Sequence, residues 1–184
     1  APPHQVSNIM TETVITTPAP YVNPDFVRHS SWLPYTRRPP VYIVGCGAVG
    51  SHVAMLLARL GFEDFHLFDG DKVEALNLAN QAFCRFDVGK LKTDALRDQL
   101  LNFSSNIEIT THGLFTGETE IEKGYVFCGV DSFSARRMVL DRCIQLLEQG
   151  KEIYSFTDFR LGFNYGRSYL IDFYSAEAKE DVAN

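Results

Sequence analysis

A run of β-branched and aromatic residues, Val41 to Val44, leads directly into a glycine-rich stretch, Gly45-Cys-Gly-Ala-Val-Gly50. Apolar residues recur at helical spacing after this stretch, so the pattern predicts a strand, a tight turn and a helix. In such a turn the first glycine allows the bend, Gly47 lets a phosphate approach the backbone, and Gly50 lets the helix pack closely on the strand. The helix N-terminus then favours a bound anion. This unit is typical of a doubly wound α/β fold.

A second strand is predicted from Phe65 to Phe68, and it ends in Asp69, nineteen residues after Gly50. A carboxylate at this place in a dinucleotide-binding fold accepts hydrogen bonds from ribose hydroxyls. A plain turn at Asp69-Gly-Asp71 is the alternative, because Asp and Gly favour turns.

Further polar residues follow where a simple dehydrogenase has no evident use for them. They fall at the predicted carboxyl edge of the sheet, where ligands bind in open α/β folds. These residues are Asn77, Gln81, Lys92 and Asp131.

Four spaced patterns occur in order along the chain: G-x-G-x-x-G-S, D-x-D-x-V-E-x-x-N-L, D-V-G-x-x-K and D-x-F-x-x-R. Together they resemble the ThiF, MoeB and HesA family, the nucleotide-binding domain of ubiquitin-activating-type enzymes, over about residues 41–173. The resemblance implies a Rossmann-like, mostly parallel sheet with helices on both faces. It also implies an adenylyltransferase that uses ATP and Mg²⁺ to activate the C-terminal carboxylate of a small ubiquitin-like or sulfur-carrier protein.

The resemblance assigns roles to individual residues of this chain. Lys92 and Asp131 are the candidate catalytic residues, with Asp131 also the Mg²⁺ ligand and Lys90 the substitute for Lys92. Two structural alternatives stay open, since Lys92 could be a solvated lysine and Asp131 could be a helix N-cap. The candidate nucleotide-binding residues are Gly45, Gly47, Gly50, Asp69, Asp71, Asn77, Gln81 and Lys92.

One position departs from the family pattern, which usually reads N-L-x-R-Q, because this chain has Asn80 in place of the arginine. A neutral amide does not replace a planar cation that stabilises charge on a triphosphate. Another arginine substitutes, or catalysis is slow, or the chain binds nucleotide without adenylating anything. The candidate substitutes are Arg85 and, in the N-terminal segment, Arg28, Arg37 and Arg38.

All eight prolines lie before Val41, which predicts an extended N-terminal arm over residues 1–40, a nucleotide-binding domain over 41–174 and a polar tail over 175–184. Trp32, Leu33 and Tyr35 suggest that part of the arm docks on the domain or on a neighbouring subunit. Within the domain we expect helices over about 90–101 and 134–149 and strands at 107–111, 125–128, 153–156 and 168–174.

A net charge of −6 argues against nucleic acid as a partner, because binding to a phosphate backbone needs a basic face. No apolar run is long enough to span a membrane, so the expected location is cytoplasmic. The four cysteines form no C-x-x-C pair, so no zinc site is expected. Family precedent favours a homodimer.

Three functions therefore remain open on the sequence. The first is the adenylyltransferase, the second is a catalytically impaired nucleotide-binding regulatory or scaffold subunit, and the third is an NAD-binding oxidoreductase. Only the first has a use for both Lys92 and Asp131.

Overall fold

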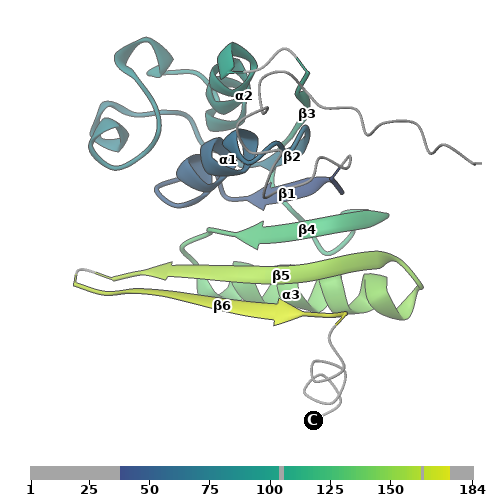
Figure 1. Ribbon diagram of the computed structural model, residues 1–184. Helices are drawn as coiled ribbons and strands as arrows, with labels where there is room; N and C mark the ends of the chain where they lie inside the picture. Colours follow the sequence, from purple (N-terminus) through teal and green to yellow (C-terminus); the bar gives the residue numbers. More distant parts are fainter. Residues whose placement is uncertain (1–37, 104–105, 163, 175–184) are drawn as a thin grey trace, which may run out of the picture.

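The computed structural model describes residues 38–103, 106–162 and 164–174 of the chain. Six strands form one sheet in the order β3-β2-β1-β4-β5-β6, in which the first five are parallel and β6 runs antiparallel to β5 (Figure 1). The strands are β1 (Val41–Val44), β2 (Asp64–Phe68), β3 (Glu108–His112), β4 (Lys123–Cys128), β5 (Glu152–Leu161) and β6 (Gly166–Asp172).

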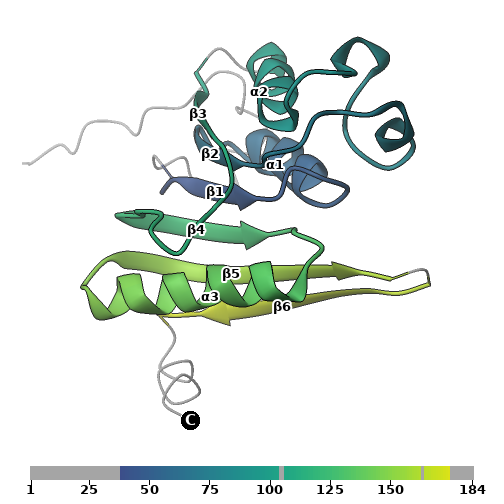
Figure 2. The same ribbon diagram turned by 180° about the vertical axis from the view of Figure 1, so that it is seen from behind.

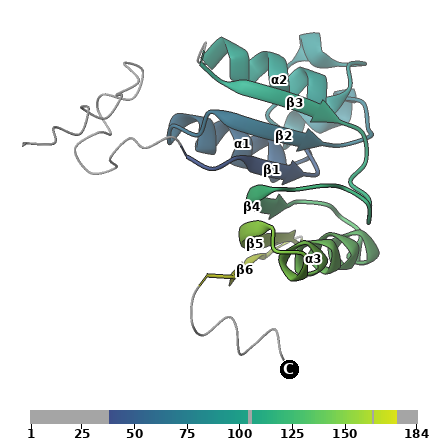
Figure 3. The same ribbon diagram turned by 90° about the vertical axis from the view of Figure 1, so that its right-hand side faces the viewer.

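Helices cover both faces of this sheet. Helices α1 (Gly50–Arg59) and α2 (Lys92–Phe103) lie on one side, and α3 (Phe133–Glu148) lies on the other (Figures 2 and 3). Two short 3₁₀ helices, η2 (Ala75–Ala79) and η3 (Arg85–Asp87), lie between β2 and α2. The predicted fold is confirmed: the sheet is mostly parallel, and its strand order reverses direction beside β1, as in a doubly wound fold.

Side chains of the central strand alternate between two cores. Val41 and Ile43 pack with α1 and α2, whereas Tyr42 and Val44 belong to the core beneath α3. All four are buried, as expected for a strand with helices on both faces. Packing on both faces holds the central strand in place, and with it the start of the loop that follows.

The buried side of α1 consists mainly of small residues. Leu56 is 58% exposed and Leu60 is 38% exposed, while Ala54, Leu57 and Ala58 face the sheet. Small side chains on this stripe let the helix backbone approach the strands closely. The glycine that precedes them, Gly50, extends the same contact.

Strand β5 is longer than the predicted 153–156, because it continues to Leu161 in a hairpin with β6. The charged residues Asp158 and Arg160 interrupt the apolar pattern, so the sequence did not predict this extension. The two predicted terminal segments lie outside the described residues, apart from 38–40. Within the described part of the chain, no helix is long and apolar enough to cross a membrane.

Candidate functional site

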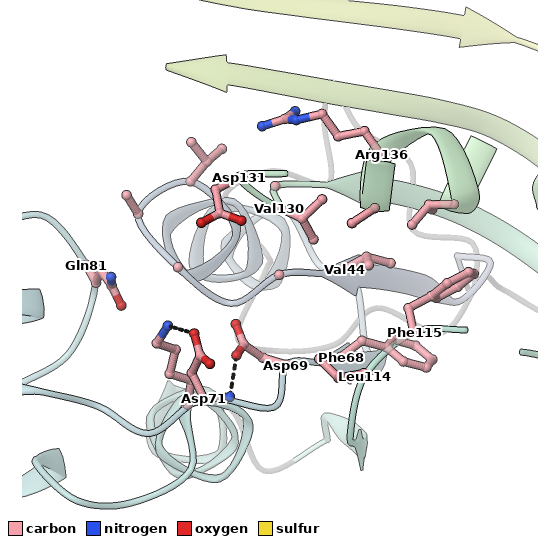
Figure 4. A pocket seen from close by; sticks show the side chains of 18 of the residues that line it. Val44, Phe68, Asp69, Asp71, Gln81, Leu114, Phe115, Val130, Asp131 and Arg136 are labelled. Carbon is pink, nitrogen blue, oxygen red and sulfur yellow. Dashed lines mark hydrogen bonds and ion pairs between the residues drawn. The ribbon is translucent and has the colours of Figure 1, made fainter. Parts of the chain in front are cut away.

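A cavity of about 500 Å³ opens at the carboxyl edge of the sheet, beside β1 (Figure 4). This is the edge and the position where open α/β folds bind ligands. Its walls come from the segments that follow β1, β2, β3 and β4, and from the first turns of α2 and α3. The polar side chains that line it are Asp69, Asp71, Gln81, Lys92, Asp131 and Arg136.

The glycine-rich loop after β1 forms the floor of this cavity, and Asp69 fixes its shape. One carboxylate oxygen of Asp69 accepts a hydrogen bond from the Cys46 backbone N–H at 2.8 Å, and the other accepts one from the Asp71 N–H at 2.8 Å. The Gly45 N–H also donates to the Phe68 carbonyl at 2.8 Å. The glycine-rich loop is therefore tied to the end of β2.

The three glycines of the loop have different surroundings. A Cβ on Gly50 would lie 1.8 Å from the Gly45 carbonyl oxygen, so no larger residue fits there. Gly45 has φ of +90° and sits against Gly129 and Val130. A Cβ on Gly47, in contrast, would meet nothing within 4 Å. Gly47 therefore leaves open space at the cavity floor, where a phosphate can approach the backbone.

Lys92 and Asp71 form an ion pair at one side of the cavity. Lys92 Nζ donates to Asp71 Oδ2 at 2.8 Å, and Lys92 is only 8% exposed. Burial alone would lower the pKa of Lys92, but the hydrogen bond to Asp71 and the charges of Asp69 and Asp71 outweigh it, so the pKa is raised. Lys92 is thus a protonated cation, and it is not the solvated lysine of the structural alternative.

Asp131 lies on the loop between β4 and α3, on the side of the cavity that faces Asp69 (Figure 4). The N-cap of α3 is Ser132, whose hydroxyl accepts from the Ala135 N–H at 3.0 Å, so Asp131 does not cap this helix. Within the described residues the Asp131 carboxylate has no hydrogen bond or ion pair. It is free to bind a ligand or a cation.

Arg136 also lines the cavity, but its charge is already balanced. Its guanidinium donates to the carboxylate of Asp158 and, at 2.6 Å, to the Phe159 carbonyl. Asp158 is buried and accepts a second bond, from Arg160 Nε at 2.7 Å. This network joins the first turn of α3 to the end of β5.

Gln81 and Asn77 come from the same sequence pattern but have different surroundings. Gln81 lines the cavity, and its buried amide oxygen has no hydrogen-bond partner among the described residues. Asn77 lies outside the cavity lining and caps η2, because its side chain accepts from the Glu74 N–H at 2.9 Å. Ser51, from the glycine-rich pattern, holds this segment by accepting from the Ala82 N–H at 3.0 Å.

No arginine of the described residues takes the place of the one missing at Asn80. Arg85 is exposed on η3 and does not line the cavity. Arg38 lies at the opposite edge of the sheet, with its guanidinium 5.0 Å from the centre of the Phe62 ring. Arg28 and Arg37 lie outside the described residues.

The apolar wall of the cavity was missed in the sequence. Leu114 and Phe115 follow β3, and Val130 and Met138 come from the segment after β4. Only their position in the sequence could have indicated this wall, since residues that follow parallel strands lie at the same edge of the sheet. An apolar wall beside a polar floor suits a ligand with a flat ring and an anionic tail.

A family model described as the ThiF family matches residues 36–155, which is more than half of the chain. Ubiquitin-like modifier-activating enzyme 5 of Caenorhabditis elegans is 33% identical over 123 residues, covering 58% of this chain and 29% of that protein. Adenylyltransferase and sulfurtransferase MOCS3 of Culex quinquefasciatus is 30% identical over 116 residues, covering 60% of this chain and 26% of that protein.

Among solved structures, Escherichia coli MccB with ATP has a TM-score of 0.57 and 26% identity, covering 67% of this chain and 37% of MccB. The chain thus spans about a third of the length of the proteins it matches. The four sequence patterns, the doubly wound sheet and the extent of the family match lead to one identification: this chain belongs to the ThiF family.

Proposed function

We propose that this chain binds ATP and adenylates the C-terminal carboxylate of a small ubiquitin-like or sulfur-carrier protein. The observation that carries the proposal is the placement of Lys92 and Asp131 at the same open cavity, above a phosphate loop already fixed by Asp69. The relatives of this chain include an activating enzyme and an adenylyltransferase, and MccB was solved with ATP.

The cavity suits a nucleotide in three respects. Its floor offers backbone N–H groups and the open space at Gly47, and its far wall is apolar. The unpartnered amide oxygen of Gln81 can accept from a ligand hydroxyl or amine. Asp69 keeps lone pairs on both oxygens for ribose hydroxyls.

Mg²⁺ is part of the proposal because of the charge of the site. Three carboxylates, Asp69, Asp71 and Asp131, line the cavity. The two cations that line it are already paired, Lys92 with Asp71 and Arg136 with Asp158. A triphosphate therefore needs a further cation. No group of three or more His, Cys, Asp and Glu in the described residues could hold a metal. At Asp131 the ion would take its other ligands from phosphate oxygens and water.

In the proposed reaction, a carboxylate oxygen of the carrier attacks the α-phosphorus of ATP, and the bond to pyrophosphate breaks. Lys92 would hold the phosphate oxygens as negative charge develops on them, a role suited to a compact ammonium group. Asp131 would position the cation that balances the leaving group. No proton transfer is required of either side chain.

Asn80 supports a second candidate, a nucleotide-binding subunit that has lost the chemistry. Asn80 is exposed at the end of η2, next to the cavity residue Gln81, and no described arginine replaces the missing cation. An arginine from a homodimer partner would restore the reaction. The homodimer, the identity of the carrier and the cytoplasmic location all remain predictions.

The test is ATP–pyrophosphate exchange with Mg²⁺, measured with and without carrier proteins that end in Gly-Gly, alongside ATP and NAD binding by calorimetry. We expect exchange that depends on a carrier. Tight ATP binding without exchange for any carrier would favour the regulatory subunit, and binding of NAD alone would refute both. The variant Asn80→Arg separates the first two, because a large rate gain means a catalytic but impaired site.

A further inference from the structure

One side of the sheet is only partly covered. On the side of α1 and α2, these helices lie over β1, β2 and β3, and no described helix lies over β5 and β6 (Figure 3). We call this region the open sheet face. Its side chains are Tyr125, Phe127, Tyr154, Phe159 and Leu170.

The strand register places four of these residues on a common side, and Tyr154 joins them through its ring contact with Tyr125. Phe127 lies opposite Thr157, and Thr157 lies opposite Leu170, so the three side chains point the same way. Phe127 also packs against the core of α1 and stacks on Phe159, with ring centres 6.3 Å apart. Leu170 is 67% exposed. The same register places Ser155 and Asp172 on this side. The face thus combines aromatic rings and Leu170 with polar side chains, and it is open to solvent at β6.

A row of contacting aromatic rings connects the start of the described chain with the open sheet face. Phe62 meets Tyr125 edge to face at 6.0 Å, and Tyr125 lies 5.3 Å from Tyr154. Tyr154 in turn lies 5.1 Å from Tyr174. The Arg38 guanidinium sits over Phe62, so the row starts where the N-terminal arm joins the domain.

The backbone at Pro40 is hydrogen-bonded to β4. The Pro40 carbonyl accepts from the Tyr125 N–H at 3.0 Å. Arg38 Nε is buried and has no hydrogen-bond partner among the described residues, which is unfavourable unless an acceptor is supplied. Residues just before Arg38 are the nearest source of such an acceptor.

The arm has the right residues within reach. Trp32, Leu33 and Tyr35 lie three to six positions before Arg38. Six extended residues span up to about 20 Å. Two strand spacings, from β4 to β6, amount to about 10 Å. Both distances allow Trp32 to lie over β5 or β6.

We propose that Trp32-Leu-Pro-Tyr35 of the same chain packs on the open sheet face and covers Tyr154, Phe159 and Leu170. This contact goes beyond the proposed function and does not depend on it. It has one functional consequence. Arg37 then lies between two anchored points at the amino edge of the sheet, opposite the cavity, so it cannot replace the missing arginine within its own subunit.

Trp32 is the single tryptophan of the chain, so its fluorescence reports the contact directly in the full-length protein. We expect a blue-shifted emission and slow quenching by acrylamide. Leu170→Glu and Tyr154→Ser should each shift the emission to the red and raise the quenching constant several-fold, because a charge or a lost ring weakens apolar packing. Leu76→Glu, at a leucine that is 72% exposed on η2, is the matched control and should leave both signals unchanged.

Circular dichroism of each variant excludes loss of the fold as the cause of a change. A solvent-exposed Trp32 in the parent protein would overturn the proposal, as would a protected Trp32 that neither variant of the open sheet face releases. Protection that falls on dilution, together with a halving of the mass by light scattering, would assign the face to a second copy and also overturn it.

Discussion

Lys92 Nζ and Asp71 Oδ2 lie 2.8 Å apart although the residues are 21 positions apart in the chain. Their exposure is unequal: the lysine side chain is 10% exposed and the aspartate side chain 74%. The cation is therefore held inside the cavity, while its partner faces water. An anionic ligand can replace Asp71 as the partner of Lys92 without moving the ammonium group into solvent.

The first prediction concerns this cation. Lys92→Met should lower carrier-dependent ATP–pyrophosphate exchange on the order of a hundredfold or more, because a preorganised charge facing the phosphates is lost. It should also weaken ATP binding measured by calorimetry.

Lys90→Met is the matched control for Lys92→Met. Lys90 pairs with Asp87 and Asp98 and does not line the cavity, so exchange should stay close to that of the parent protein. Equal losses in the two variants would contradict the role given to Lys92.

The second prediction separates two glycines of the phosphate loop. Gly50→Ala should destabilise the fold by about 1–3 kcal/mol or more, because the new methyl group overlaps the Gly45 carbonyl. Gly47→Ala should keep the parent's unfolding temperature, since its methyl group meets no protein atom, and yet bind ATP more weakly. Thermal unfolding and calorimetry measure the two effects. Unchanged ATP affinity in Gly47→Ala would mean that phosphate does not approach this point.

The third prediction concerns the buried carboxylate beside the cavity. Asp158→Asn should reduce the free energy of unfolding by about 3–5 kcal/mol, because it leaves Arg136 without its buried partner. Asp141→Asn removes the exposed partner of Arg137 and should cost at most about 1 kcal/mol. Urea unfolding of both variants gives the comparison, and similar small losses would show that the Asp158 network adds little stability.

The fourth prediction concerns acid stability. Burial alone would raise the pKa of Asp87, but hydrogen bonds from the Cys84 N–H and thiol, from Lys90 and from Gln99 lower it from 3.8 to about 2. Because the folded pKa is the lower one, the stabilisation is complete above the unfolded pKa of 3.8 and is lost as the pH falls toward 2. It amounts to about 2 kcal/mol.

Urea unfolding over this acidic range tests the assignment. Asp87→Asn should be less stable than the parent protein at neutral pH, and the difference should shrink as the pH falls from about 4 to 2. A constant difference across this range would show that the ionised carboxylate of Asp87 does not stabilise the folded protein.

The fold was predictable where the pattern is local. The glycine spacing after Val44 and the acidic end of β2 indicated the two strands and the loop between them, because each depends on neighbours along the chain. Helix α1 was predicted as well, from apolar residues at helical spacing. Its buried side includes Ala54 and Ala58, whose small side chains allow close packing on the sheet.

The site was predictable only in part, since several of its contacts depend on register between distant elements. The bond from Cys46 N–H to Asp69 joins residues 23 positions apart, and Arg136 reaches Asp158 over 22 positions. No local spacing encodes such pairs. The bond from the Glu74 N–H to Asn77, in contrast, is local, and the sequence pattern did not indicate it.

The ties between Asp69 and the phosphate loop also bear on how fast a nucleotide can bind. A loop that is already held in one shape by hydrogen bonds has little conformational entropy to lose when a ligand binds. We therefore expect nucleotide association to be limited by diffusion and desolvation, with no slow ordering step at the floor of the cavity. Differences in affinity among nucleotides should accordingly appear in their rates of dissociation.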